Sequence, residues 1–96
     1  MERRKAEFLG DVVMRFLRQS GLESPLNEYR LMASWGEVAG AAAQRYTQNV
    51  YIRNQRLHVK LRSAVLRAEL MMRRADLVEK LNGRVGAQVI TDICFY

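Results

Sequence analysis

The sequence predicts an α+β domain in which a three-stranded sheet packs on helices, in the order α-α-(α)-β-β-α-β. Three changes of hydrophobic period support this fold class. Apolar residues recur at helical spacing up to residue 46, alternate with polar residues over 47–62, and return to helical spacing from residue 63. Alternation reappears over 87–96. A chain of 96 residues is enough for a single domain, 1–96, with one modest core.

Residues 5–46 are predicted to form the N-terminal helices. In the first helix, 5–19, apolar side chains recur every three or four residues: Phe8, Leu9, Val12, Val13, Phe16 and Leu17. Ser24 and Pro25 are residue types that begin a helix, so a second helix is expected from there. A short third helical segment is expected between this helix and the first strand.

Residues 47–62 are predicted to form a β-hairpin with Asn54-Gln55 as its turn. In this register Ile52 faces Leu57 and Val50 faces Val59, so the apolar residues share one face. The other face collects basic and aromatic side chains: Tyr51, Arg53, Arg56, His58, Lys60 and Arg62. We call this the outer face and expect nucleic-acid-binding residues on it.

Ser63 is predicted to cap a single long helix over 63–83. A stripe of leucines would pack this helix on the hairpin: Leu66, Leu70, Leu77 and Leu81. Four other side chains project beside the stripe: Arg67, Met71, Arg74 and Val78. Arg67 and Arg74 either lay their stems over apolar surface with their charged heads in water or lie beside a second contact that Met71 and Val78 make. That contact is with the N-terminal helices or with another subunit, and in the second case all four would be partner-binding residues.

The run Gly83-Arg84-Val85-Gly86 separates this helix from the last predicted strand, 87–96. It matches the G-x-x-G pattern with which one class of domains clamps a nucleic-acid backbone. In those domains the loop joins two helices, whereas here it precedes a strand. We therefore favour a helix C-cap at Gly86 over clamping.

The chain is strongly basic, with sixteen Lys and Arg against ten Asp and Glu and a formal net charge of +6. Arginine outnumbers lysine thirteen to three, and the guanidinium fork suits phosphate. This balance favours a polyanion partner, and the outer face has the mixed basic and aromatic character of a single-strand-binding platform. The alternatives are that the outer face is only solvated, or is covered by the N-terminal helices.

No catalytic constellation is present in the sequence. His58 is the only histidine and Cys94 the only cysteine, which leaves neither a nucleophile with a base nor a four-ligand zinc site. A Walker-type phosphate loop is also absent. We therefore expect no enzyme activity, no cofactor and no metal. The lone cysteine and the lack of a signal or membrane segment point to the cytoplasm.

Five motifs follow one another along the chain: Trp35-Gly36-Glu37-Val38-Ala39-Gly40, Leu57-His58-Val59, Leu66-Arg67-x-Glu69-Leu70, Leu81-Asn82 and Asp92-Ile93-x-Phe95. In this order they resemble the DciA family, a bacterial family long described as a domain of unknown function. The resemblance covers nearly the whole chain and is greatest to the short, single-domain members. It implies a K-homology-like fold.

The resemblance also implies a role in initiating chromosome replication. A protein of this family helps to load the DnaB-type replicative helicase and itself binds DNA, single-stranded or double-stranded. Longer members carry a C-terminal extension that contributes to contacts. The family offers neither a nucleotide site nor catalytic residues, so the site residues named above rest on the residue patterns alone.

These observations predict a non-enzymatic, nucleic-acid-binding accessory factor of DNA replication. The alternative is a protein-interaction module whose partner is the helicase or a second copy of the chain, with the positive charge only steering association. In that case the interface residues would be Met71, Met72 and Val78. RNA binding also remains open, because no residue pattern in the sequence predicts whether the protein distinguishes RNA from DNA by the 2′-hydroxyl.

Overall fold

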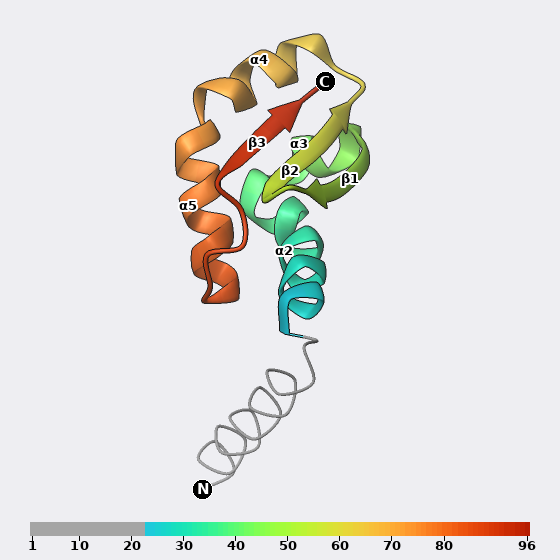
Figure 1. The fold of residues 1–96 in the computed structure, drawn as a ribbon. Helices are drawn as coiled ribbons and strands as arrows, with labels where there is room; N and C mark the ends of the chain where they lie inside the picture. Colours follow the sequence, from blue (N-terminus) through green and yellow to red (C-terminus); the bar gives the residue numbers. More distant parts are fainter. Residues whose placement is uncertain (1–22) are drawn as a thin grey trace, which may run out of the picture.

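The computed structural model describes residues 23–96. Two helices, α2 (Glu23–Ala39) and α3 (Ala41–Tyr46), precede the hairpin of β1 (Thr47–Arg53) and β2 (Arg56–Leu61). Two more helices, α4 (Ala64–Met72) and α5 (Arg74–Val85), lead to β3 (Asp92–Phe95). The α+β class and the three-stranded sheet are therefore confirmed (Figure 1). The helix predicted over 5–19 lies outside the described residues.

The two helices before the hairpin meet at Gly40. Its φ of 108° is a backbone conformation that glycine adopts at little cost, and it ends α2 and starts α3. Ser24 and Pro25 lie in the first turn of α2, where the missing N–H of proline is tolerated. None of the described helices has the length and apolar character needed to cross a membrane.

The hairpin has the register predicted from the sequence. Ile52 pairs with Leu57 and Val50 with Val59 in an antiparallel ladder. The turn residues Asn54 and Gln55 both have positive φ, 54° and 61°, as a two-residue type I′ turn requires. Leu57 and Val59 are fully buried, so the predicted separation of an apolar face from an outer face is confirmed.

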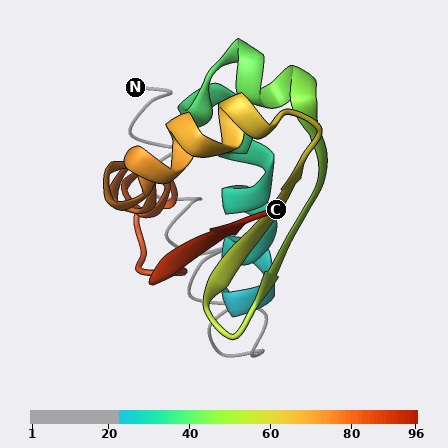
Figure 2. The ribbon, with the colours of Figure 1, turned by 90° about the horizontal axis from the view of Figure 1, so that it is seen from above.

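The third strand pairs in parallel with β2, which gives the sheet order β1-β2-β3. Figure 2 shows the three strands side by side, with α2 passing behind them. The core lies between the apolar face of the sheet and the helices. Its largest fully buried side chains are Leu31, Leu57, Leu70, Leu77, Leu81, Ile90 and Ile93. Trp35 of α2 donates a hydrogen bond to the Thr47 hydroxyl at 3.0 Å and so ties α2 to the start of β1.

The prediction of one helix over 63–83 is wrong, because the helix breaks at Arg73. Ser63 does cap α4, since its hydroxyl accepts a hydrogen bond from the Leu66 N–H at 3.2 Å. At Arg73, φ is −100° and ψ is 8°, and the N–H bonds to the Leu70 carbonyl three residues back. A straight helix over 64–85 would be about 33 Å long, whereas a six-residue strand spans roughly 20 Å. The break lets α4 cross the end of the sheet while α5 packs on α2 and β3.

The last strand is shorter than the predicted 87–96, since β3 begins only at Asp92. The preceding backbone bonds to the Asn82 side chain, whose oxygen accepts from the N–H groups of Val89 and Ile90 at 3.0 and 3.1 Å. The amide nitrogen of Asn82 donates to the Ile90 carbonyl at 2.9 Å. Backbone groups that are bonded to a side chain do not pair with a neighbouring strand, so the ladder starts later.

Candidate nucleic-acid interface

The outer face of the sheet is the side that Figure 1 turns toward the reader, with α2 and α3 behind the strands. Tyr51 and Arg53 of β1 lie on it beside His58 and Arg56 of β2, their cross-strand partners. Lys60 lies further along β2 and is exposed. The parallel pairing of β2 with β3 extends this face onto the last strand. Five of the six predicted nucleic-acid-binding residues are therefore neighbours on one surface.

A hollow of about 430 Å³ opens at the tip of the hairpin. It is lined by Arg53, Asn54, Arg56 and His58. Arg53 and Arg56 are directly opposite each other in the ladder, and neither forms an ion pair with another described residue. Like charges in this arrangement destabilise a hairpin. An anion between the two guanidinium groups would remove that repulsion, so the hollow suits a phosphate group.

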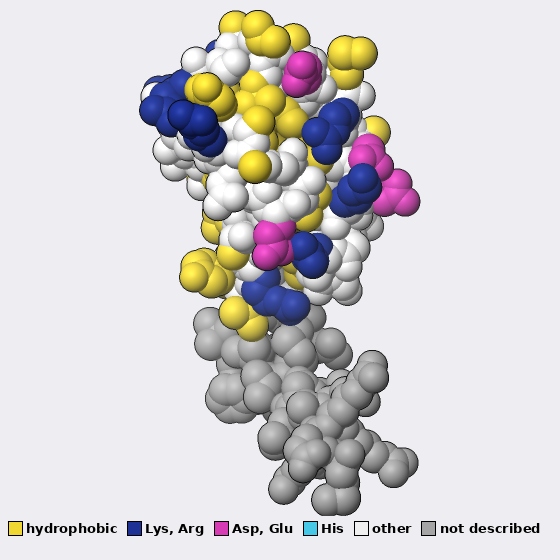
Figure 3. Space-filling model, turned by 180° about the vertical axis from the view of Figure 1, so that it is seen from behind, with side chains coloured by type: hydrophobic (Ala, Val, Ile, Leu, Met, Phe, Trp, Pro, Cys, Tyr) yellow, Lys and Arg dark blue, Asp and Glu magenta, His cyan; other side chains and the backbone are white. Residues whose placement is uncertain are grey.

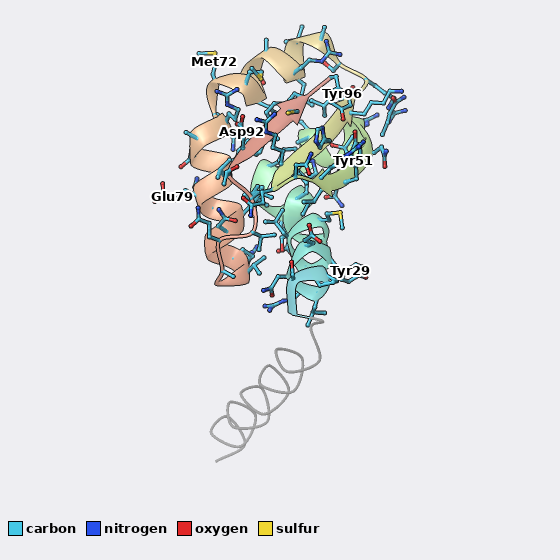
Figure 4. All side chains as sticks on the ribbon, in the orientation of Figure 1. Tyr29, Tyr51, Met72, Glu79, Asp92 and Tyr96 are labelled. Carbon is cyan, nitrogen blue, oxygen red and sulfur yellow. The ribbon has the colours of Figure 1, made fainter. Side chains whose placement is uncertain are left out.

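Three aromatic rings form a cluster next to the hollow. The rings of Tyr51 and His58 are stacked, with centroids 4.6 Å apart and an interplanar angle of 5°. The ring of Tyr96 is tilted against His58 at 6.0 Å, and the Tyr51 and Tyr96 hydroxyls are 2.7 Å apart (Figure 4). Tyr51 is 40% exposed and Tyr96 43% exposed. The cluster thus offers aromatic surface beside the arginine-lined hollow.

The sixth predicted residue, Arg62, lies away from this group. It follows β2 at the end opposite the hairpin turn, where its guanidinium donates to the Arg45 carbonyl at 2.8 Å. The Arg62 guanidinium also lies 6.0 Å from the centre of the Tyr46 ring, and that of Arg45 lies 5.8 Å from it. Arg62 therefore belongs to a second basic and aromatic group, about the length of β2 from the hollow.

The family model for DciA, described as Dna[CI] antecedent, matches residues 9–95. The chain belongs to the DciA family. Membership implies a role in loading the DnaB-type replicative helicase at the initiation of replication, and the family is non-enzymatic. No curated protein matches this sequence.

Tyr96 was not among the predicted site residues of this DciA-family chain. A signal for it exists, since Asp92, Cys94 and Tyr96 alternate with the apolar residues of the last strand. The partner of that strand could not be read from the sequence. Only the parallel pairing, in which Cys94 lies beside His58, shows that this alternating set shares the outer face.

The four candidate partner-binding residues do not form one surface. Arg74 pairs with Asp92, with its Nε 3.2 Å from a carboxylate oxygen, and Val78 is half-buried against the core. Met71 is 45% exposed. The Nε of Arg67 is buried and has no hydrogen-bond partner among the described residues. The Arg74 pair also means that the Asp92 carboxylate, beside Arg56 in the sheet, is already neutralised.

The G-x-x-G run has the role of a helix C-cap. Helix α5 continues to Val85, and Gly86 follows with a φ of 80° and an N–H bonded to the Asn82 carbonyl. Arg84 within the run pairs with Glu37 of α2. The C-cap interpretation is confirmed, and the side chain of this run that could meet a phosphate is engaged elsewhere.

The contact between the two tyrosines predicts a measurable titration. The hydrogen bond with Tyr51 raises the pKa of Tyr96 from 10.0 to about 12, and partial desolvation adds to the effect. We expect the Tyr51→Phe variant to return the pKa of Tyr96 toward 10.0. Carbon-13 NMR of labelled tyrosine rings would follow Tyr96 directly.

The sign of this shift gives a second expected result. A raised pKa means that the folded state favours the neutral hydroxyl, so the stabilisation is complete below pH 10 and is lost as pH rises toward 12. The Tyr51→Phe variant should lose less stability over that interval than the wild type. Tyr29→Phe, on α2, is the control and should leave the Tyr96 titration unchanged. An unchanged Tyr96 pKa in Tyr51→Phe would contradict the hydroxyl contact.

Proposed function

We propose that this DciA-family chain holds nucleic acid on the outer face of its sheet while it helps to load the DnaB-type helicase. The observation that carries the proposal is the hollow between Arg53 and Arg56, adjacent to the Tyr51–His58–Tyr96 cluster on the same face. The mixed three-stranded sheet with its helices supports a K-homology-like classification as part of the same proposal. A loader of the replicative helicase acts on the chromosome, which in a bacterium is in the cytoplasm.

Two kinds of contact favour a single strand over a duplex. Phosphate groups bind the paired guanidinium groups through charge-assisted hydrogen bonds, which carry no sequence information. Unpaired bases stack on aromatic rings with about 1–3 kcal/mol per base, whatever the base. In a duplex the base faces are covered by their neighbours, so only the phosphate contacts remain. The proposed ligand is therefore single-stranded DNA, bound without strong sequence preference.

A salt titration tests the proposal. Labelled single-stranded DNA, the matching duplex and single-stranded RNA of the same sequence would each be titrated with the protein at several salt concentrations. We expect the DNA single strand to bind more tightly than the duplex, with log affinity falling linearly with log salt. Absent binding at low salt, or a flat salt dependence, would rule out the phosphate contacts. Tighter binding of the RNA would reassign the function to RNA.

A protein-interaction role is the second candidate, and exposed apolar side chains on α4 favour it. The predicted partner-binding residues are Arg67, Met71, Arg74 and Val78. Of these, Met71 offers the most direct apolar contact, since Arg74 is paired and Val78 is packed against the core. The partner would be the helicase or a second copy of the chain, and nucleic-acid and protein contacts need not exclude each other.

A further inference from the structure

The outward side of α4 is apolar over the whole length of the helix. Leu66 and Leu70 face the core, whereas the opposite side of the nine-residue helix carries Ala64, Val65, Ala68, Met71 and Met72. At 100° per residue these five side chains fall within about 120° of one another. All five are exposed, with Val65 at 73% and Met72 at 88%. We call them the α4 surface.

A helix with apolar residues on opposite sides, as in α4, usually packs against other structure on both of those sides. A helix with one buried face usually shows polar residues opposite, whereas α4 shows apolar residues in both directions. Figure 3 shows hydrophobic side chains gathering over the end of the molecule that α4 forms. Several exposed apolar side chains on one side of a helix are typical of contacts with other proteins.

The charges around the α4 surface indicate the chemistry of the partner. Arg67 lies along one edge, and its guanidinium makes no ion pair or hydrogen bond with another described residue. Arg73 follows the helix directly and is exposed, as is Glu69 on the other edge. Arg67 and Arg73 have no ion pair among residues 23–96, and two such cations against one anion, on a chain of net charge +6, favour a partner with acidic groups at its margins.

The shape of the α4 surface fits a helix. Ala64 and Ala68 have small side chains, which let a partner backbone approach closely. The long, flexible side chains of Met71 and Met72 can adapt to the partner's surface. An apolar stripe of this length matches two to three turns of a facing helix, which would supply residues three and four apart.

We propose that the α4 surface docks an amphipathic helix of the replicative helicase, one with an apolar stripe and acidic flanks. The inference rests on the helicase-loading role proposed above and adds to it the surface and the chemistry of the contact. A second copy of the chain fits less well, because two copies would each bring a charge of +6.

The position of the α4 surface leaves the outer face free. Met72 points away from the sheet at the end of α4, whereas Tyr51 and Tyr96 lie over the strands (Figure 4). DNA on the sheet and a helicase helix on α4 would therefore not compete for the same atoms. The expected complex contains all three components at once.

Met72→Glu tests this inference with the full chain and the replicative helicase of the same organism. A carboxylate within the apolar contact, facing acidic flanks, should weaken helicase binding by at least about tenfold. The side chain is 88% exposed, so the fold should not change. Tyr29→Glu is the matched control, because it replaces another exposed apolar residue, 67% exposed on α2, with the same charge. Val65→Glu is a second variant on the same surface.

Helicase affinity and single-stranded DNA affinity would be measured separately for each variant. Loss of helicase binding in Met72→Glu and Val65→Glu, with DNA affinity equal to that of Tyr29→Glu, would support the α4 surface. Unchanged helicase binding in both variants would overturn it and leave the loading role intact. A wild-type chain that does not bind the helicase would overturn both. Self-association of the wild type that Met72→Glu abolishes would assign the α4 surface to a second copy instead.

Discussion

Replacing Arg53 and Arg56 together with Ser should lower the affinity for single-stranded DNA about 100-fold at low salt. The two guanidinium groups face each other across the hairpin and line the hollow at its tip. A charge-assisted hydrogen bond contributes about 1.5–3 kcal/mol, so the loss of two contacts costs roughly 3 kcal/mol. The slope of log affinity against log salt should also become shallower by about 1.4, which is 0.7 for each lost phosphate contact.

The control for this variant removes the same charge from another place. Arg30 and Arg84 are exposed on α2 and α5, and replacing both with Ser should change DNA affinity only through net charge, by a few-fold. Arg53→Lys with Arg56→Lys should recover the salt slope but not the full affinity, since lysine lacks the fork that grips phosphate. Equal losses of DNA affinity in the Arg53/Arg56 and Arg30/Arg84 variants would show that DNA binds through the overall positive charge and that the hollow is not a specific phosphate site.

The hairpin was predictable because its information is local. Alternation with a period of two fixes which residues share a face, and a shift by one residue would turn Leu57 and Val59 to the solvent. The asparagine at position 54 tolerates the positive φ that the turn needs. Five of the six nucleic-acid-binding candidates were therefore placed together correctly by the sequence alone, since strand alternation decides that placement.

The break at Arg73 was not predictable from the same kind of pattern. Leu70 and Leu77 are one heptad apart and lie on the same side of a straight helix, so the periodicity continues through the break. The break follows from tertiary structure, because α4 has to cross the end of the sheet and α5 has to reach α2. Met71 and Met72 were predicted as interface residues in the alternative role, whereas the extension of this side to Ala64, Val65 and Ala68 was not recognised, since the orientation of α4 depends on the break.

The remaining parts of the site depended on contacts between distant residues. Tyr96 joins Tyr51 only because β3 pairs in parallel with β2, and the sequence left that pairing open. Arg62 departs from the outer face because the carbonyl of Arg45 and the ring of Tyr46 lie within its reach. Neither contact has a short-range signal in the sequence.

Asn82 shows how one side chain sets where the last strand begins, and its replacement with Ala should be strongly destabilising. Its amide bonds three backbone groups, the N–H groups of Val89 and Ile90 and the Ile90 carbonyl. Ile90 is fully buried, so water does not readily replace these bonds. Leaving buried backbone groups unpaired costs about 1–3 kcal/mol each, and we expect a total loss of roughly 3 kcal/mol. For a domain of this size the unfolding midpoint would fall by roughly 15 °C.

Two further variants separate hydrogen bonding from packing at this position. Asn82→Leu keeps the branched shape and the number of heavy atoms of the side chain but not its polar atoms, so it should be as unstable as Asn82→Ala if the bonds are responsible. Gln88→Ala removes an exposed neighbouring side chain and should stay within about 0.5 kcal/mol of the wild type. Amide exchange would report the cause directly, because the Val89 and Ile90 amides should lose protection in both Asn82 variants. Recovery of stability in Asn82→Leu would mean that Asn82 fills space, and the late start of β3 would then need another cause.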